Sequence, residues 1–366
     1  MKIGILGGGQ LGRMLALSAH ALGLRTAIVD PAAESAAGQV APVLRAAWDD
    51  ARARELLASC DVVTYEFENV PDDVVASLAG SVAVHPAPVA LAATSDRLHE
   101  KQLFASHGLA TPRFRAVDSA ADLERAVDEL GLPAVVKTRR FGYDGKGQRV
   151  LRVDSDVAGA WRALGPQPLL LEEWIDFDRE VSLLAVRGRD GQVRFWEPTE
   201  NTHVDGILRV SRAPAPGVGE EALRAVAARC EALLARLDYV GVAAFELFAR
   251  GDRWIANEAA CRVHNSGHWT IEGAVTSQFE NHLRAVAGLP LGSTASRGPV
   301  AMVNLIGVLP DPESVLALSG AHLHRYGKTP APGRKLGHVP LRATHRAGLE
   351  PALRLGLPMT LREGRR

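Results

Sequence analysis

The sequence predicts an α/β protein in which a parallel sheet comes first and mixed α+β parts follow. Three observations lead to this prediction. Short apolar runs alternate with helical patterns over the first hundred residues, which is the rhythm of a doubly wound parallel sheet. A glycine cluster lies between the first apolar run and the first helical pattern. Later strands are separated by glycine-containing turns, a pattern typical of antiparallel pairs.

The first of three predicted domains spans residues 1–110 and holds the parallel sheet. Its strands are short apolar runs and its helices show apolar residues at helical spacing. We expect strands at 2–7, 25–30, 61–67 and 82–85, and helices at 10–22, over about eight residues from Asp72, and at 89–107. Thr111-Pro112 ends the last helical pattern, because the residue before a proline avoids the helical region.

The second and third domains are predicted at residues 111–187 and 188–366. The second is a small α+β unit with a helix at 120–130 and strands at 134–138, 148–153, 169–175 and 180–187. The third is a mixed sheet with a helix at 220–237, strands at 241–248, 253–259 and 300–306, and loops at 262–270 and 332–338. Three domains fit a chain of 366 residues.

The composition excludes several classes of protein. Forty-two basic and 42 acidic residues balance, so no global field favours nucleic acid or an anionic membrane. Three widely spaced cysteines without a CxxC pair argue against a disulfide framework or a zinc site. The start lacks the long apolar region of a signal peptide, and no run approaches the ~18 residues of a membrane span. We expect a soluble, cytoplasmic protein.

Lysine is rare in this chain, which otherwise uses arginine. The six lysines are Lys2, Lys101, Lys137, Lys146, Lys328 and Lys335. A lysine kept among so many arginines points to a need for a flexible point charge. Three of the six lie inside the motifs described below.

The glycine cluster Gly7–Gly12 matches GxGxxG between a strand and a helix, and Asp30 ends the second strand. This is the dinucleotide fingerprint in its usual context. The glycines allow a close backbone approach and the helix N-terminus favours an anion. A phosphorylated substrate would use the same device, so the pattern alone leaves the ligand open.

Two glutamates are expected to face each other across a hairpin. A turn centred near Asp252 places Glu246 opposite Glu258, six residues to either side, with Cβ atoms ~5 Å apart. Like charges at that distance need a cation between them. Carboxylates next to the amide of Asn257 suit Mg²⁺. The alternative is a pair of solvated carboxylates in a slipped register.

A lysine and a glycine-rich loop suggest a phosphate site. Lys137 ends a buried apolar strand, and Gly142, Gly145 and Gly147 follow within a short loop that also holds Lys146. Such a loop can fold its amides over an anion. It is not a Walker A loop, because no GK[ST] opens a helix. The apolar run 169–175 turns acidic at its end, where it can present a carboxylate to a purine and a ribose.

The most polar segment is residues 262–270, Arg-Val-His-Asn-Ser-Gly-His-Trp-Thr, shortly after Asn257-Glu258. It is too irregular for a core strand or an amphipathic helix. A loop with so many directional donors and acceptors is typical of a polar ligand site. The alternative is a solvated connection.

In chain order these features resemble the ATP-grasp superfamily and, within it, the 5-(carboxyamino)imidazole ribonucleotide synthases. The resemblance extends from residue 4 to about 338, and the segment after Asn257-Glu258 is its most specific part. The matching motifs are residues 7–14, 64–70, 142–148, 203–207, 264–270 and 333–338. Cys261 departs from the family, which usually has proline there, and we expect at most a local backbone effect. The tail after His338 is short for the family.

The resemblance implies the fold and the residues of the site. The fold would be ATP-grasp, with a Rossmann-like first domain, a central lid and a C-terminal domain that carries the metal. ATP contacts are implied for Arg97, Lys137, Gly142, Tyr143, Asp144, Gly145, Lys146, Gly147, Gln148, Glu172, Glu173, Trp174, Ile175, Glu180, His203, Asn257 and Glu258. Ribonucleotide and bicarbonate contacts are implied for Gln10, Leu11, Glu66, Tyr143, Asp144, Lys146, Asn265, Ser266 and Lys335. Glu246 and Glu258 would bind Mg²⁺, and Tyr143, Asp144, Lys146 and Arg262 would serve catalysis.

The implied reaction is the carboxylation of 5-aminoimidazole ribonucleotide with ATP and bicarbonate, through carboxyphosphate, by a homodimer. Neither nucleic acid nor membrane is an expected partner. Asp144 would accept a proton from the exocyclic amine. Three alternatives stay open. They are an NAD(P)-dependent oxidoreductase built on Gly7–Gly12, a non-catalytic nucleotide-binding paralogue, and a sister ligase that uses formate or another carboxylate.

Overall fold

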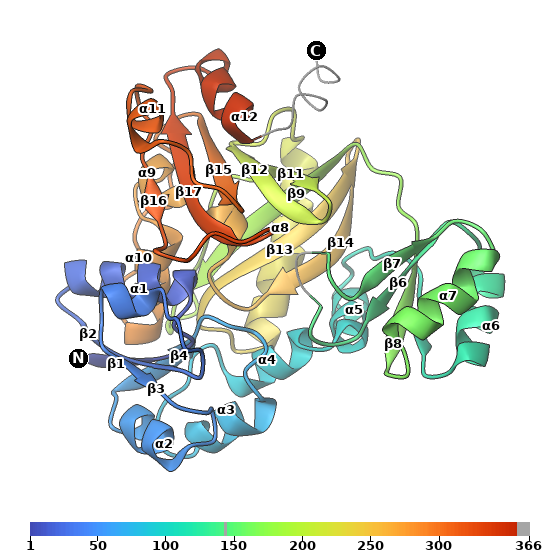
Figure 1. Cartoon of the computed structure of the whole chain (residues 1–366), viewed down its shortest axis with the longest axis horizontal. Coiled ribbons are helices and arrows are strands. Elements are labelled where there is room, and N and C mark those ends of the chain that lie inside the picture. Colours follow the sequence, from blue (N-terminus) through green and yellow to red (C-terminus); the bar gives the residue numbers. More distant parts are fainter. Residues whose placement is uncertain (143–144, 357–366) are drawn as a thin grey trace.

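A computed structural model describes residues 1–142 and 145–356 of the chain. Its strands form three sheets, of four, four and nine strands. Figure 1 shows the N-terminal sheet in blue, the second sheet as a separate green lobe at the right, and the largest sheet between them. No helix within the described ranges has the length and apolarity to cross a membrane.

The N-terminal sheet is parallel, with strand order β3-β2-β1-β4. Its strands are buried apolar runs, as expected where helices cover both faces. They are β1 (Lys2–Leu6), β2 (Arg25–Asp30), β3 (Val43–Arg45) and β4 (Val62–Tyr65). The accompanying helices are α1 (Gln10–Ala21), η1 (Ala37–Gln39), α2 (Ala51–Ala58) and α3 (Asp72–Ala79). The strand predicted at 82–85 is shorter than expected: it pairs with β4 through one parallel bridge, Val63 to Val84, before Pro86, which has no N–H to extend a ladder.

The predicted long helix at 89–107 is wrong, because it is two helices. These are α4 (Pro88–Thr94) and α5 (Arg97–Ser106). Asp96 between them is extended, and its side chain accepts hydrogen bonds from the amides of Leu98 and His99. An N-cap of this kind competes with helix continuation. The new helix axis directs Arg97 toward the third sheet.

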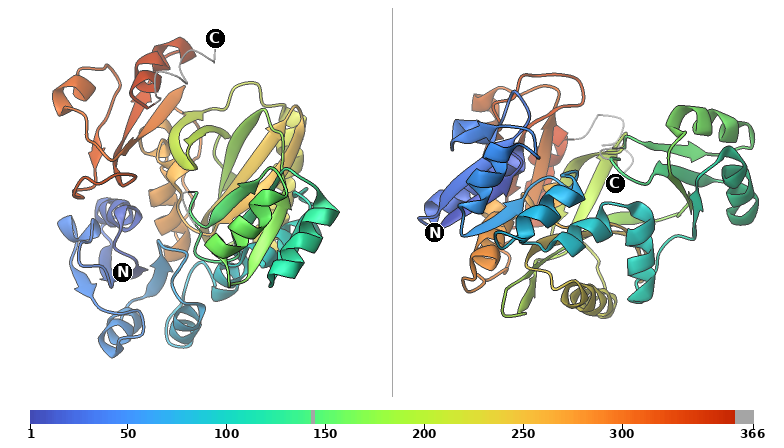
Figure 2. Two further views of the ribbon diagram at one scale, coloured as in Figure 1. Left: turned by 45° about the vertical axis from the view of Figure 1, so that its right-hand side comes forward. Right: turned by 90° about the horizontal axis from the view of Figure 1, so that it is seen from below.

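The central sheet is antiparallel, with strand order β5-β8-β6-β7. Two helices pack on it and complete a small core of its own, and Figure 2 shows this lobe from two further sides. The elements are β5 (Phe114–Val117), α6 (Ala120–Leu130), β6 (Ala134–Thr138), β7 (Gln148–Leu151), α7 (Ser155–Leu164) and β8 (Leu169–Glu173). Of these elements, α7 is not among the helices predicted from the sequence.

The third sheet runs in the order β14-β13-β9-β11-β12-β15-β17-β16, with β10 beside β9. Its strands are β9 (Arg179–Arg187), β10 (Val193–Phe195), β11 (Thr199–Val204), β12 (Ile207–Ala213), β13 (Gly241–Arg250), β14 (Arg253–Ala260), β15 (Val300–Ile306), β16 (His324–Arg325) and β17 (Lys335–Arg342). The predicted loop at 332–338 is therefore only partly a loop. From Lys335 onward it pairs with β15, because alternate apolar residues fill the sheet core.

Helices cover both faces of the third sheet. Ala243 and Phe245 of β13 pack with α8 (Glu220–Arg236), while Val242 and Ala244 pack with α10 (Gln278–Ala287). The remaining short helices are η2 (Asn265–Gly267), α9 (Thr270–Gly273), α11 (Pro312–Leu316), η3 (Arg346–Leu349) and α12 (Glu350–Gly356). Since α10 also contacts α1, the N-terminal and third sheets share a core. That packing holds the segments around the site together.

Candidate active site

Glu246 on β13 and Glu258 on β14 face each other across antiparallel strands, so the predicted pairing is confirmed. The turn, however, is not centred on Asp252 as predicted. Arg250 pairs with Arg253, so the turn is Gly251-Asp252. Gly251 has φ +55°, as a two-residue hairpin with glycine at its first position requires.

With this turn, the pairing of Glu246 with Glu258 needs one extra residue on β14, and a β-bulge at Asn257 supplies it. Leu247 pairs with Ala256 and Glu246 pairs with Glu258, which leaves Asn257 without a partner. If Asn257 were instead part of the regular ladder, Glu258 would lie opposite Phe245 and point to the other face of the sheet, because side chains alternate along a strand. The bulge thus brings the two carboxylates to one face.

Burial and the charge of Glu258 raise the pKa of Glu246 to about 8. Burial also opposes ionisation of Glu258, but Arg97 outweighs it and lowers the pKa of Glu258 to about 2. Arg97 Nη1 lies 2.6 Å from Glu258 Oε2, and His264 Nε2 lies 3.2 Å from Glu246 Oε1. Two carboxylates that resist joint ionisation are a fitting place for a divalent cation.

The donor set fits Mg²⁺ and excludes a soft metal. The two glutamates offer oxygen ligands only, and magnesium takes its other ligands from phosphates and water. Across residues 1–142 and 145–356, no group of three or more His, Cys, Asp or Glu side chains is placed to hold a metal ion. A transition-metal centre therefore has no support in the described part of the chain.

Lys137, at the end of β6, reaches into the same charged region and is almost fully buried. Its Nζ lies 2.9 Å from Glu172 Oε2 and 3.3 Å from the side-chain oxygen of Asn257. Burial raises the pKa of Glu172, but Lys101 and Lys137 outweigh it and lower that pKa to about 2. The central lobe thus contacts β14 of the third sheet through the charged side chain of Lys137 and the side-chain oxygen of Asn257.

The central glycine loop, residues 142–148, connects β6 to β7. Gly145 and Gly147 have φ of +75° and +73°, a region that side chains strain. A Cβ on Gly147 would lie 2.6 Å from Thr138 Oγ1, and one on Gly145 would lie 3.1 Å from the carbonyl oxygen of Asp205. Tyr143 and Asp144 lie outside the described residues, while Lys146 and Gln148 are exposed.

Two ion pairs fix the base of this loop to the N-terminal part of the chain. Arg139 Nη2 lies 2.6 Å from Asp96 Oδ2, and Arg140 Nη2 lies 2.8 Å from Asp72 Oδ2. Asp96 is also the N-cap of α5, the helix that carries Arg97. The loop base and the arginine at Glu258 are therefore positioned by one carboxylate.

The acidic end of β8 presents its side chains in alternation. Glu172 is buried against Lys137, whereas Glu173 points away and pairs with Arg113 at 2.7 Å. Trp174, just after the strand, is 40% exposed, with the guanidinium of Arg152 5.5 Å from its ring centroid. Ile175 beside it is half-buried. The backbone N–H of Glu173 also donates to the carbonyl oxygen of Arg113 at 2.9 Å.

His203 on β11 and Glu180 on β9 form a second acidic–basic pair. Nδ1 of the imidazole lies 2.5 Å from Glu180 Oε2. Burial lowers the pKa of His203, but the hydrogen bond and charge of Glu180 outweigh it and raise that pKa. The pair adds one hydrogen-bonding carboxylate to the same sheet face.

In the N-terminal glycine loop, Gly7–Gly12, two backbone amides donate hydrogen bonds to side chains of the same chain. Gly8 N–H donates to Asp30 Oδ2 at 2.5 Å, and Gly9 N–H donates to Glu66 Oε1 at 2.8 Å. In a dinucleotide site those amides hold the pyrophosphate and the acidic residue holds the ribose. Here the amides of Gly8 and Gly9 and the carboxylate of Asp30 are already hydrogen-bonded within the chain. The geometry therefore argues against an NAD site.

A pocket of about 310 Å³ lies beside the N-terminal glycine loop and is lined by Glu34, Ser35, Ala36, Gly327, Lys328 and Thr329. Ser35 donates to the carbonyl oxygen of Gly8, and Lys328 Nζ lies 2.5 Å from Gln10 Oε1. Leu11 is buried behind the loop. The pocket combines a cation and hydroxyls, which suits an anionic group.

The polar segment 262–270 is more buried than a solvated connection. His268, Trp269 and Thr270 point into the core. Arg262 pairs with Glu68 at 2.8 Å, and Ser266 Oγ lies 2.8 Å from His264 Nδ1. Neither side-chain polar atom of Asn265 has a hydrogen-bond partner among the described residues, although both are buried. Buried amides left open in this way are a mark of a ligand site.

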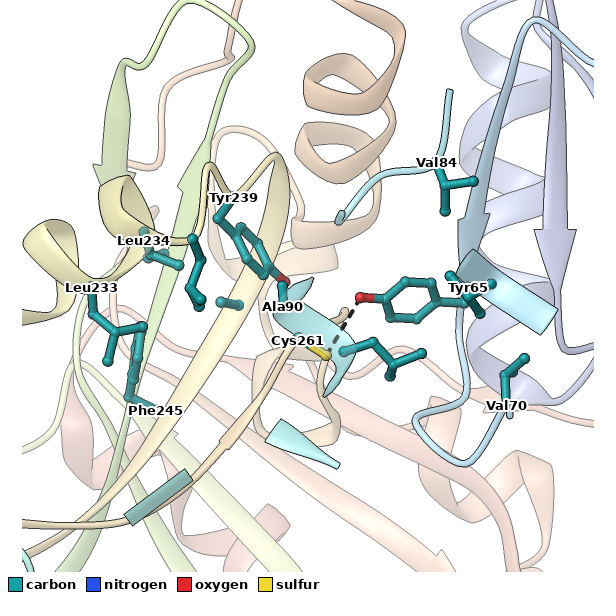
Figure 3. Close-up of a cluster of buried hydrophobic side chains, with 14 of the residues drawn as sticks. Tyr65, Val70, Val84, Ala90, Leu233, Leu234, Tyr239, Phe245 and Cys261 are labelled. Atoms are coloured by element: carbon teal, nitrogen blue, oxygen red, sulfur yellow. Dashed lines mark hydrogen bonds between the residues drawn. The ribbon is translucent and has the colours of Figure 1, made fainter. Parts of the chain in front are cut away.

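Cys261 lies just before this segment, and Figure 3 shows the phenol of Tyr65 directed at it. The thiol is buried and accepts hydrogen bonds from Tyr65 at 3.5 Å and Thr94 at 3.0 Å. Burial raises the pKa of Cys261 to about 11, so the thiol stays neutral. It connects the N-terminal sheet to β14 and does not reach the charged groups.

Several residues of this region were not predicted as site residues. Lys101, Ser35 and Lys328 reach it from elements far apart in the sequence. Glu68 and His264 belong to predicted motifs, but no role was assigned to either. The low lysine count pointed to Lys101 and Lys328, but spacing alone gave them no partners. Lys335 and Arg262, by contrast, were predicted and lie at the start of β17 and just after β14.

Comparisons with known proteins first give the class. Residues 102–279 match the ATP-grasp domain, residues 1–95 the ribonucleotide synthetase preATP-grasp domain, and residues 300–350 the phosphoribosylaminoimidazole carboxylase C-terminal domain. The chain is an ATP-grasp ligase.

The particular family follows from full-length relatives. The N5-carboxyaminoimidazole ribonucleotide synthase of Pseudomonas aeruginosa is 51% identical over 96% of this chain and 97% of that protein. The crystal structure of the Thermus thermophilus synthetase has 52% identity and a TM-score of 0.92, covering 96% of each chain. An Aspergillus clavatus structure in complex with ADP and 5-aminoimidazole ribonucleotide has 30% identity and a TM-score of 0.88, covering 97% and 98%. This chain belongs to the N5-carboxyaminoimidazole ribonucleotide synthase family.

Proposed function

We propose that the chain carboxylates the exocyclic amine of 5-aminoimidazole ribonucleotide in purine biosynthesis. A bicarbonate oxygen attacks the γ-phosphorus of ATP, which gives carboxyphosphate and ADP. The amine then takes the carboxyl carbon, the phosphate leaves, and the amine loses a proton. The observation that carries this proposal is one charged surface made by Glu246, Glu258 and Lys137 beside the open amide of Asn265, in a chain of this family.

The nucleotide would lie between the central lobe and the third sheet. Lys137 and the amides of the central glycine loop would hold phosphates, while the segment 172–175 would receive the purine. Arg97, Glu180, His203 and Asn257 border the same space. Catalysis of phosphoryl transfer is mainly positioning and charge neutralisation, and these residues supply both.

Glu246 and Glu258 would hold Mg²⁺, because their oxygens face each other and one of them resists ionisation. When bound, the ion would neutralise charge on the nucleotide phosphates. Arg97, which pairs with Glu258 in this structure, would then be free to turn toward a phosphate.

The ribonucleotide would lie on the side of the N-terminal glycine loop. Gln10, Leu11 and Glu66 form that loop and its support. Asn265 and Ser266 of η2 and Lys335 at the start of β17 would complete this part of the site. Arg262, held by Glu68, would attract bicarbonate. Tyr143, Asp144 and Lys146 of the central loop would close over both substrates, with Asp144 accepting the proton of the amine.

The experiment that tests the function is ADP release with Mg-ATP and bicarbonate, with and without 5-aminoimidazole ribonucleotide. Strong dependence on the ribonucleotide is expected. Equal release without it would reject the acceptor, and a response to formate would move the chain to the sister ligases. Asp144→Asn should keep ATP binding and lose most carboxylation; near-normal turnover would remove Asp144 from the mechanism.

We also propose a cytoplasmic homodimer, as the family resemblance implies. Light scattering at micromolar concentration tests the assembly. A monomeric mass would contradict it.

A further inference from the structure

Lys101 is a fully buried lysine that the proposed reaction does not use. It lies on α5, one helical turn after Arg97, with no solvent exposure. Lysine is almost never found in such a position unless its charge is paired. The chain keeps a lysine here although it uses arginine nearly everywhere else.

The ammonium of Lys101 contacts the same two residues as Lys137, from the other side. Its Nζ lies 3.4 Å from Glu172 Oε1 and 2.6 Å from the carbonyl oxygen of Asn257. Lys137 lies 2.9 Å from Glu172 Oε2 and 3.3 Å from the side-chain oxygen of Asn257. The two lysines, the carboxylate and the asparagine form a closed ring.

The carbonyl held by Lys101 belongs to the bulge residue. Asn257 has no partner in the strand pairing, and a bulge leaves such a residue outside the ladder. Lys101 donates to Asn257 O and, at 3.4 Å, to Ala256 O. The same ammonium therefore supports the bulge that turns Glu258 toward Glu246.

Charge balance explains why two lysines share one carboxylate. Lys137 is the closer partner of Glu172, at 2.9 Å, and Lys101 pairs with the other carboxylate oxygen at 3.4 Å. Two lysines against one carboxylate leave one net positive charge, which attracts an external anion toward Lys137. If Lys101 were neutral, Glu172 would hold Lys137 alone, and the nucleotide would have to break that ion pair. A buried ion pair is strong because little water screens it.

We propose that Lys101 is a positioning residue for nucleotide binding, which acts through Glu172 to leave Lys137 available to phosphate and through Asn257 to set the metal-facing bulge. This inference rests on the proposed nucleotide role of Lys137. Lys101 touches no substrate in this arrangement.

The test is Lys101→Met, with steady-state kinetics for each substrate. We expect KM for ATP to rise about tenfold or more while KM for the ribonucleotide stays within about twofold, because one binding mode is disturbed and the other is not. A merely structural role would lower the amount of active enzyme and leave both KM values unchanged. An unchanged KM for ATP overturns the proposal.

Glu100→Gln is the matched control. Glu100 is on the same turn of α5, is buried, and accepts from the amide of Ala259 on the same strand at 2.6 Å. Glutamine keeps that acceptor, so KM for ATP should stay within about twofold. An equal rise in both variants would assign the effect to helix packing and overturn the specific role of Lys101.

A double variant tests the route through Glu172. In Lys101→Met/Glu172→Gln, Lys137 no longer faces an unbalanced carboxylate and only the lost support of the Asn257 carbonyl remains, so KM for ATP should exceed that of Glu172→Gln by much less than the rise of about tenfold expected for Lys101→Met. If the two substitutions instead multiply their separate effects on KM for ATP, Lys101 does not act through Glu172. This comparison also decides the case if Lys101→Met alone fails to fold, because removing both charges avoids an unpaired buried ion.

Calorimetry with a non-hydrolysable ATP analogue and Mg²⁺ separates this proposal from the proposed function. A weaker Kd in Lys101→Met supports the positioning role even if the wild type shows no ribonucleotide-dependent ADP release. An unchanged Kd overturns the role of Lys101 whatever the reaction proves to be.

Discussion

The two glycine-rich loops have similar composition and opposite structural roles. The N-terminal glycine loop is held from within, because Asp30 and Glu66 accept from its amides. Among the described residues, the central glycine loop is fixed at its base by Arg139–Asp96 and Arg140–Asp72. Its glycines pack against Thr138 and the turn at Asp205. The amides of Gly8 and Gly9 in the first loop are thus occupied by carboxylates of this chain, whereas the second loop is surrounded by the charges of the proposed nucleotide site.

The difference teaches that a glycine pattern names a backbone shape and not a ligand. The fingerprint at Gly7–Gly12 is complete, yet two of its amides are occupied by neighbouring carboxylates. A nucleotide site is indicated instead by the charged side chains around the central glycine loop. Substitutions in the two loops and at the neighbouring charges test this contrast, from the largest expected effect to the smallest.

Gly147→Ala should break the central loop. The residue has φ +73°, and a Cβ would meet Thr138 Oγ1 at 2.6 Å. Since a misplacement of about 1 Å can cost about 100-fold in rate, kcat/KM should fall by that order. Melting should change little, because the described neighbours Gly145, Lys146 and Gln148 are exposed. Gly23→Ala, also at positive φ but with open space around it, is the control for backbone strain alone, and similar losses in both variants would contradict the role of the loop.

Glu66→Ala should show that the N-terminal loop depends on its internal acceptor. Loss of the carboxylate leaves the amide of Gly9 unpaired, which costs about 2 kcal/mol of unfolding free energy. KM for the ribonucleotide should rise and KM for ATP should not. Glu66→Gln keeps an acceptor and should lose much less stability. Equal destabilisation by Ala and Gln would show that the hydrogen bond to Gly9 is unimportant.

Glu246 should make the metal-free protein sensitive to pH. Its pKa rises from 4.5 to about 8 on folding, so the folded state binds this proton more tightly than the unfolded state. The stabilisation is complete below pH 4.5 and is lost as pH rises through 8. The Tm of the wild type should therefore fall by a few degrees relative to Glu246→Gln between about pH 5 and 8. Parallel curves would contradict the raised pKa. Glu258, with its lowered pKa, changes only below this window.

Cys261→Ala should have the smallest effect, because it touches neither loop. The substitution removes the sulfur that accepts from Tyr65 and Thr94, but Thr94 keeps a second acceptor in the carbonyl of Ala90. Unfolding free energy should fall by about 1 kcal/mol with kcat unchanged. A large loss of activity would show that Cys261 helps to place Arg262.

Local pattern predicted the parallel sheet, most strands and the pairing of Glu246 with Glu258. The pairing was correct although the turn centre was not, since an unseen bulge at Asn257 compensated. The split at Asp96 was missed because a capping carboxylate also occurs inside helices. Lys101 and Glu68 were missed because their partners lie far away in sequence, and only packing brings such charges together.

The bulge at Asn257 adds contacts to the charged face without being needed for the facing of the two glutamates. Deleting Asn257 would make Ala256 and Glu258 neighbours in a regular ladder, opposite Leu247 and Glu246, so Glu258 would still face Glu246. The residue that would be lost is the one whose backbone carbonyl accepts from Lys101 and whose side-chain oxygen accepts from Lys137. A shorter β14 would therefore keep its carboxylates paired and lose its link to the two lysines.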